Sequence, residues 1–211
     1  MRPFSALFLL AGWAAWPPPP DAPAPAGPPG PPEVLKVVFT EEQRPLDPSS
    51  DTLFYHQRHA TAEDFRGSPG IGARSDAVSF TSFGFDGSTR RFRDTLEVRL
   101  VLQVFWVRSA SWTRMQPPSR HILVHEQLHF DITRLVAERF RKKVLSMPLT
   151  IDDHDSRIQY EYLESFREMN QLQEAFDDEA HHGADGLAEA RWQQRIHSAL
   201  REEGVIPAQL P

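Results

Sequence analysis

The hydrophobic pattern of this chain changes its period once, within the segment QPPSR (116–120), and this change constrains the order of its secondary structure. Before it, residues 77–87 and 94–107 alternate apolar and polar side chains and are enriched in β-branched and aromatic residues. A period of two is typical of strands with one buried and one solvated face. After it, apolar residues recur every three or four positions up to Phe140, which predicts a helix of about twenty residues. Ser119 follows two prolines and is suited to cap that helix.

The other expected elements complete an order of strands followed by helices. A short strand is predicted at 34–40, and DGSTRRFRD (86–94) would join the two alternating segments as a hairpin. Two more helices are predicted over about 152–175 and 184–203, separated by the turn-forming stretch DDEAHHGADG (177–186). This order is that of an α+β fold, so we expect three helices packed on one face of a small antiparallel sheet.

The N-terminal segments have compositions unlike that of the rest. Residues 1–16 carry one Arg and then an apolar run of about a dozen residues, which is short for a membrane span and matches a secretory signal peptide. Residues 17–32 are rich in Pro, Ala and Gly and predict an extended linker. We therefore expect a folded domain over 33–211, secreted or held in the periplasm or cell envelope. An uncleaved N-terminal anchor is the one membrane contact expected.

The composition of the chain excludes several kinds of partner and catalytic group. The chain of 211 residues has a formal net charge of −6 and no long run of Lys or Arg, so nucleic acid is not expected as a partner. It contains no cysteine, which excludes disulfides, thiolate catalysis and thiolate ligands. Any metal must then be held by His, Asp or Glu side chains.

The motif His125-Glu126-Gln127-Leu128-His129 has the pattern HExxH. On a helix, positions i and i+4 lie on the same side, so His125 and His129 can reach one ion, and Zn²⁺ suits two imidazoles. Glu126 is then placed to take a proton from a metal-bound water as general base. Apolar residues surround the motif, which predicts a buried helix where unpaired polar groups would be costly without a metal.

A catalytic zinc usually has a third protein ligand, and the residues alone leave it open. Glu161 and Glu164 on the next predicted helix are candidates. So are His181 and His182 in the turn after it. His121 is interpreted as a solvent-facing residue at the helix start.

Other residues near the motif suggest supporting roles. Asp131 is expected to support a ligand histidine or to cap helix packing. His181, Tyr160 and Tyr162 are candidates for stabilising a transition-state oxyanion. His197 has no partner at ligand spacing and is interpreted as an ordinary surface histidine.

The run HILVHEQLHFDITRLVAERF (121–140) resembles the HEQxHFDI signature of a bacterial family described as predicted secreted zinc-dependent proteases (domain of unknown function 922), in the zincin-like metallopeptidase superfamily. EDFRGSP (63–69), SASW (109–112) and FDDEAHHGADGLAEARWQQRI (176–196) resemble other parts of it. The resemblance covers about 63–196 and implies a zincin-like fold with His182 as third ligand.

Together these features predict an exported zinc metalloendopeptidase that hydrolyses peptide bonds in a protein or peptide substrate through a zinc-activated water, with Glu126 as base. Two alternatives share the same residues. One is a zinc-stabilised envelope protein without catalysis, and the other is a zinc hydrolase of a non-peptide amide.

Overall fold

The computed structural model describes residues 30, 32–73 and 75–207, and all of its helices and strands lie in the unit Pro31–Pro211. The predicted signal segment, 1–16, lies outside the described residues. So does the predicted linker, 17–32, apart from Gly30 and Pro32. No helix in the described part of the chain has the length and apolar character needed to cross a membrane.

The main sheet is built around the long strand β5 (Thr95–Val107). β4 (Thr81–Phe92) and β2 (Thr52–Phe54) pair with it antiparallel, whereas β1 (Val34–Glu41) pairs with it in parallel. The prediction of an antiparallel sheet was therefore wrong, and the sheet is mixed. Residues 42–94 separate β1 from β5 and provide the long connection that parallel pairing needs.

The predicted hairpin is confirmed, but its connection is shorter than expected. β4 continues to Phe92 and β5 begins at Thr95, so Arg93 and Asp94 alone form the turn. Arg93 takes the left-handed conformation with φ 56° that tight hairpin turns require. A second, two-stranded sheet pairs β3 (Ala77–Val78) with β6 (Trp112–Thr113).

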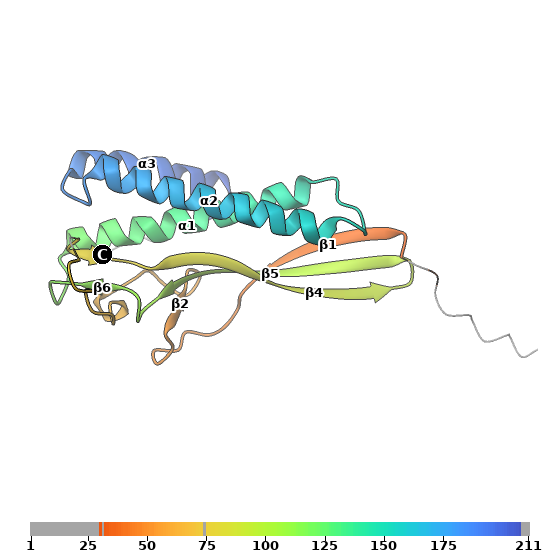
Figure 1. The fold of residues 1–211 in the computed structure, drawn as a ribbon, viewed down its shortest axis with the longest axis horizontal. Coiled ribbons are helices and arrows are strands. Elements are labelled where there is room, and N and C mark those ends of the chain that lie inside the picture. Colours follow the sequence, from red (N-terminus) through yellow and green to blue (C-terminus); the bar gives the residue numbers. More distant parts are fainter. Residues whose placement is uncertain (1–29, 31, 74, 208–211) are drawn as a thin grey trace, which may run out of the picture. The chain divides into compact units, whose positions relative to one another are not determined.

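Three helices lie on the same side of the main sheet (Figure 1). They are α1 (Arg120–Ser146), α2 (His154–Ala180) and α3 (Gly186–Glu202). The side chain of Ser119 accepts a hydrogen bond from the backbone N–H of Ile122, which confirms it as the N-cap of α1. The α+β class and the number of helices are as predicted, although α1 and α2 are both longer than expected.

The core has two parts, separated by α1. One lies between the sheet and the first two helices and contains the buried rings of Phe83, Trp106, Phe130 and Phe140. The other joins the three helices through Leu128, Ile132, Leu135, Phe176, Trp192, Ile196 and Leu200. Because α1 is covered on both sides, its residues from His125 to Glu138 are all buried, as its nearly continuous apolar character predicted.

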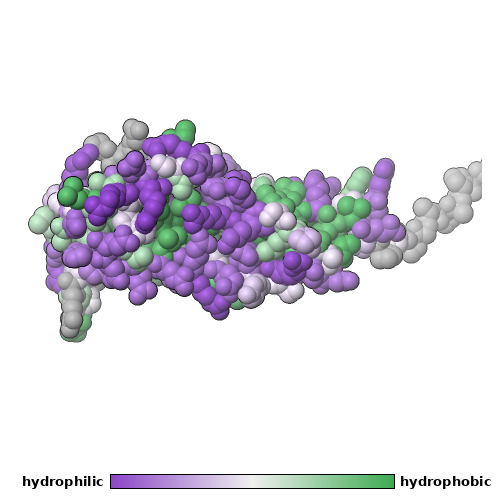
Figure 2. Space-filling model, turned by 90° about the horizontal axis from the view of Figure 1, so that it is seen from above, coloured by the Kyte–Doolittle hydropathy of each residue, from purple (hydrophilic) through white to green (hydrophobic). Residues whose placement is uncertain are grey.

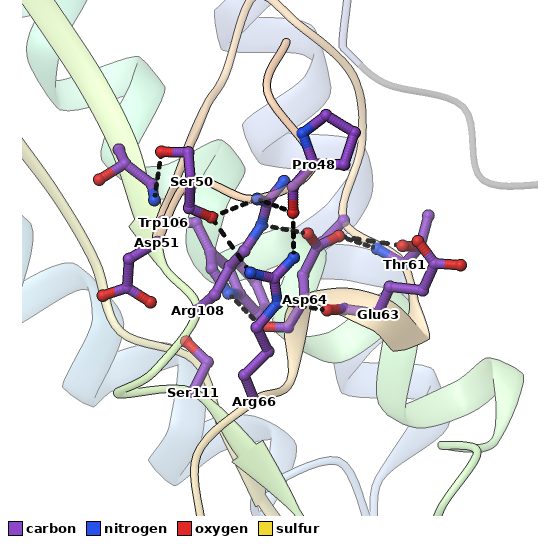
Figure 3. A network of polar contacts seen from close by, with 12 residues as sticks. Pro48, Ser50, Asp51, Thr61, Glu63, Asp64, Arg66, Trp106, Arg108 and Ser111 are labelled. Atoms are coloured by element: carbon purple, nitrogen blue, oxygen red, sulfur yellow. Dashed lines mark hydrogen bonds and ion pairs between the residues drawn. The ribbon is translucent and has the colours of Figure 1, made fainter.

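A buried ion-pair network ties a loop to the end of β5 (Figure 3). Asp64 ends the 3₁₀ turn η1 (Ala62–Asp64), is fully buried, and accepts two hydrogen bonds from Arg58, at 2.6 and 2.9 Å. The fully buried Arg108 donates to the same carboxylate at 2.8 Å, and Trp106 donates its indole N–H to the backbone carbonyl of Asp64. Burial would raise the pKa of Asp64, but the bonds from Arg58 and Thr61 hold it below its ordinary value.

The surface over the helices is mostly hydrophilic, and its larger hydrophobic areas lie toward the half of the sheet that carries the hairpin turn (Figure 2). Leu145 at the end of α1 and Tyr160 and Leu163 near the start of α2 are exposed. Tyr160 is therefore a surface residue of the first half of α2.

Candidate metal centre

Two helices bring three possible metal ligands together. α1 places the imidazoles of His125 and His129 one turn apart on the same side. The last turn of α2 places the carboxylate of Asp177 between them, with its Oδ1 3.1 Å from Nε2 of each histidine. The three ligand atoms lie within 4.8 Å of one another, and both histidines are buried.

This arrangement fits a divalent ion with nitrogen and oxygen ligands. In a tetrahedral zinc site with bonds of about 2.0–2.1 Å, ligand atoms lie about 3.3–3.4 Å apart. The distances from Asp177 to the two histidines are close to that value. Two imidazoles and one carboxylate also leave a fourth position for water or substrate, as catalytic zinc sites do.

Without a metal, the same groups form an ion pair. Burial acts to lower the pKa of His125, but its hydrogen bonds to the carboxylates of Asp177 and Glu189 and the nearby charge of Glu126 raise it to about 9. Burial acts to raise the pKa of Asp177, but the two histidines hold it well below its ordinary range. A metal cation would take over the role of the protons that His125 and His129 share with Asp177.

The ring of Phe176 forms the floor of this centre. It is fully buried, stacks on His125 with ring centroids 4.6 Å apart, and meets His129 edge-on at 5.0 Å. Trp192 of α3 packs behind it at 5.6 Å. The aromatic contacts restrict the rotation of both imidazoles, so their Nε2 atoms stay directed toward Asp177.

Glu126 lies beside the histidines in a cavity of about 540 Å³. The walls of the cavity come from residues 75–79, from α1 and α2, and from the loop 181–184. Glu126 is 4% exposed, and its carboxylate forms no hydrogen bond or salt bridge with any described residue. It lines the cavity next to His125, and its negative charge acts on that imidazole.

The loop after α2 carries the two histidines that the sequence offered as third ligands. Both have left-handed backbone conformations, with φ 50° at His181 and 52° at His182, and both line the cavity. The side chain of His182 is 67% exposed, and its Nδ1 lies 3.6 Å from Oδ1 of Asp177. His182 therefore lies next to the three-residue group without belonging to it. The ring of His181 contacts the backbone carbonyl of Asp178 through its Nδ1.

The glutamates considered as third ligands lie elsewhere. Glu161 pairs with Lys143, and Glu164 with Arg167. Both precede Asp177 on α2 by at least 13 positions, which is about 20 Å along a helix. They are too far from His125 to share an ion with it.

The two tyrosines expected to stabilise a transition state, Tyr160 and Tyr162, lie away from the candidate centre. Tyr160 is 63% exposed on the first half of α2. Tyr162 donates its hydroxyl to the backbone carbonyl of Phe83 and packs among the core rings. Neither lines the cavity that holds Glu126, because α2 is long enough to separate its two ends. His181 does line it and stays a candidate.

Of the two roles expected for Asp131, its contacts fit helix packing and not the support of a metal ligand. It accepts hydrogen bonds from Tyr55 and from Gln127, and lies 2.7 Å from Nε2 of His197. Two positions along a helix amount to about 200° of rotation, so Asp131 is turned away from the side on which His129 lies. His197 is consequently a partly buried partner of Asp131 on α3, and the interpretation of it as an ordinary surface histidine was wrong.

A second carboxylate, that of Glu189, contacts the other ring nitrogen of His125, and the sequence interpretation missed it. Its Oε2 lies 3.3 Å from Nδ1 of His125, and its Oε1 lies 3.5 Å from Nδ1 of His121. The Nε2 of His121 also contacts the backbone carbonyl of Gly183. His121 is thus half-exposed at the start of α1, as its interpretation as solvent-facing predicted, and also contacts residues around the centre.

The comparisons with known proteins bear on this part of the chain. Residues 106–183, from the end of β5 to Gly183, match the model of a family described as "Bacterial protein of unknown function (DUF922)". No curated protein and no solved structure matched the chain significantly. The matched segment contains His125, Glu126, His129 and Asp177. Over residues 106–183 the chain is therefore similar to that bacterial family.

Proposed function

We propose that this protein is an exported zinc-dependent metallopeptidase of zincin-like type, with its centre at the HEQLH turn of α1. The observation that carries the proposal is the convergence of His125, His129 and Asp177 beside the unpaired, buried carboxylate of Glu126. Ligands of this kind next to a free carboxylate suit metal-assisted hydrolysis. The apolar N-terminal run in the sequence supports export.

His125, His129 and Asp177 would hold the ion, and His182 is the alternative to Asp177 as third ligand. Bound Zn²⁺ supplies Lewis acidity that polarises a scissile carbonyl and lowers the pKa of water. Phe176 keeps the two imidazoles oriented, and the buried setting strengthens the interaction of their lone pairs with a cation.

Glu126 would act as general base and then as general acid. Its carboxylate takes a proton from the attacking water and returns it to the leaving amine, so the residue ends each cycle ionised. No hydrogen bond or salt bridge of its carboxylate is found among the described residues, so both oxygens would be available for this transfer. His181 and His182 line the cavity, and either would donate a hydrogen bond to the developing oxyanion.

The substrate would be an extended protein or peptide segment. One wall of the cavity is the stretch 75–79, which includes β3 (Ala77–Val78). An extended chain can pair with a strand edge through its backbone and present a carbonyl to the centre. This mode of binding supports a peptide substrate over a non-peptide amide.

The variant Glu126→Gln tests the proposal. We expect it to bind zinc as the wild type does and to lose hydrolysis of unfolded protein substrates by about 10²–10⁴-fold. Glu174→Gln, which changes an exposed glutamate on α2, serves as the control and should retain activity.

Three other outcomes have distinct meanings. A wild-type protein that binds zinc and cleaves no protein or peptide would support a zinc-stabilised envelope protein. Cleavage of cell-wall amides alone would indicate the non-peptide hydrolase. Full activity of the Glu126→Gln variant would exclude Glu126 as the base.

A further inference from the structure

Glu189 is a buried carboxylate that joins three parts of the candidate centre. It lies in the first turn of α3, and its side chain is 7% exposed. Its two oxygens contact two different histidines of α1, His125 at 3.3 Å and His121 at 3.5 Å. A buried carboxylate requires such partners. Here one partner is His125, a proposed metal ligand, and the other is His121, one turn before it on α1.

The contact with His125 determines which of its nitrogens can bind a metal. A carboxylate accepts hydrogen bonds, so Glu189 requires a proton on Nδ1 of His125. The other nitrogen, Nε2, faces Asp177 and shares a proton with it in the metal-free protein. When a metal displaces that proton, the lone pair of Nε2 is available to bind the metal. His129 has no such support, because its buried Nδ1 has no hydrogen-bond partner in the described part of the chain. Of the two imidazoles, His125 is the one whose Nδ1 contacts a carboxylate among the described residues.

The contact with His121 links Glu189 to the loop after α2. Nε2 of His121 reaches the backbone carbonyl of Gly183, which has φ 88°. A Cβ atom at position 183 would lie 3.3 Å from Nε2 of His121 and 3.5 Å from Nδ1 of His125. The loop therefore packs directly on both imidazoles, and Glu189 holds them from the side of α3.

We propose that Glu189 is a positioning residue for the metal centre: it fixes His125 with Nε2 toward the metal and, through His121, holds the loop that carries His181 and His182. The inference rests on the proposed function in that it assigns a metal to His125. It assigns α3 a part in the centre, although α3 supplies none of the three ligands.

The test compares zinc affinity in full-length variants, by competition with a chromophoric chelator. Glu189→Ala should weaken zinc binding by about 10–100-fold, as removal of a carboxylate behind a ligand histidine does. Glu189→Gln keeps an oxygen that can accept from Nδ1 and should recover most of that loss. Glu168→Ala is the matched control, because Glu168 is a partly buried glutamate that pairs with Arg139 and Lys143 away from the centre. It should bind zinc like the wild type.

A second readout separates positioning from general stability. Long-range ¹H–¹⁵N spectra of the ring nitrogens report which nitrogen of His125 carries the proton in the zinc-loaded protein. We expect a proton on Nδ1 in the wild type and in Glu189→Gln, and a mixture of tautomers in Glu189→Ala. If Glu189→Ala does not fold, a several-fold weaker zinc affinity of Glu189→Gln, with melting as in the wild type, still supports the role.

Equal zinc affinity of Glu189→Ala and the wild type, or an equal loss in Glu168→Ala, would overturn the inference. The two proposals fail separately. A wild-type protein that binds zinc without hydrolysing any substrate counts against the hydrolase and leaves the role of Glu189 supported by the affinities.

Discussion

Nε2 of His125 lies 3.1 Å from Oδ1 of Asp177, although 52 positions of sequence separate the two residues. The contact exists because α2 continues to Ala180, which puts Asp177 in its last turn, and because α2 packs against α1. Oδ1 of Asp177 lies at the same distance, 3.1 Å, from Nε2 of His129. Asp177 is therefore the residue best placed to complete a metal site begun by the HEQLH motif.

Asp177→Asn tests this third ligand. The amide keeps the shape of the side chain and removes the anionic oxygen that faces both histidines, so zinc affinity should fall by at least about 100-fold. Asp178→Asn changes the adjacent, exposed carboxylate and should bind zinc normally. His182→Ala should also retain zinc, measured by metal analysis after dialysis. Retention in Asp177→Asn together with loss in His182→Ala would make His182 the ligand.

The sequence could predict the part of the centre that depends on local geometry. The i, i+4 spacing of His125 and His129 puts both on one side of any helix. The third donor depends on where α2 ends. The polar composition of DDEAHHGADG (177–186) predicted a turn beginning at Asp177, whereas α2 continues to Ala180. The apolar series Met169, Leu172, Phe176 was a signal for a longer helix, since Ala180 continues it at the same spacing.

For the fold, too, the sequence predicted the features that depend on local geometry and not those that depend on distant residues. Alternation along residues 94–107 predicted the central strand and its buried face, because period two is a property of the strand itself. It carries no information about which strand lies beside it, so the parallel pairing of Val34 with Thr95 could not be foreseen. Likewise, the bonds of Asp131 to Tyr55 and His197 join residues 76 and 66 positions apart.

Gly183→Ala should lower stability and zinc affinity by disturbing the loop 181–184. Position 183 has φ 88°, which costs any residue with a Cβ about 1 kcal/mol of stability, and the new Cβ would also press on His121 and His125. We expect lower stability and a zinc affinity reduced by about tenfold or more. Gly204→Ala is the matched control, because Gly204 has φ 79° with nothing within 4 Å of a Cβ. It should lose stability alone. Equal zinc affinities of the two variants would contradict this prediction.

The metal-free protein should lose stability as the pH rises from neutral. The pKa of His125 is raised from 6.5 to about 9 in the folded state, because its bonds to Asp177 and Glu189 outweigh the effect of burial. Protonated His125 then stabilises the fold fully below pH 6.5, and this contribution is lost as the pH passes through about 9. Zinc affinity should rise over the same range, since ligand imidazoles must lose their protons. Urea unfolding of chelator-treated protein at several pH values measures the first effect, and a flat profile would contradict it.

Asp64→Asn should destabilise the fold without touching the centre. The substitution leaves the guanidinium of Arg108, which is fully buried, without its carboxylate, and it weakens the bonds from Arg58. Removing one partner of a buried ion pair lowers the free energy of unfolding by about 3–5 kcal/mol. Urea unfolding should show this loss, while zinc affinity of the folded protein stays at the wild-type level, because Asp64 is not among the residues that line the cavity. Glu63→Gln changes the neighbouring exposed carboxylate and should stay within about 0.5 kcal/mol of wild type. Similar stabilities of the two variants would show that the network of Arg58, Asp64 and Arg108 contributes little to the fold.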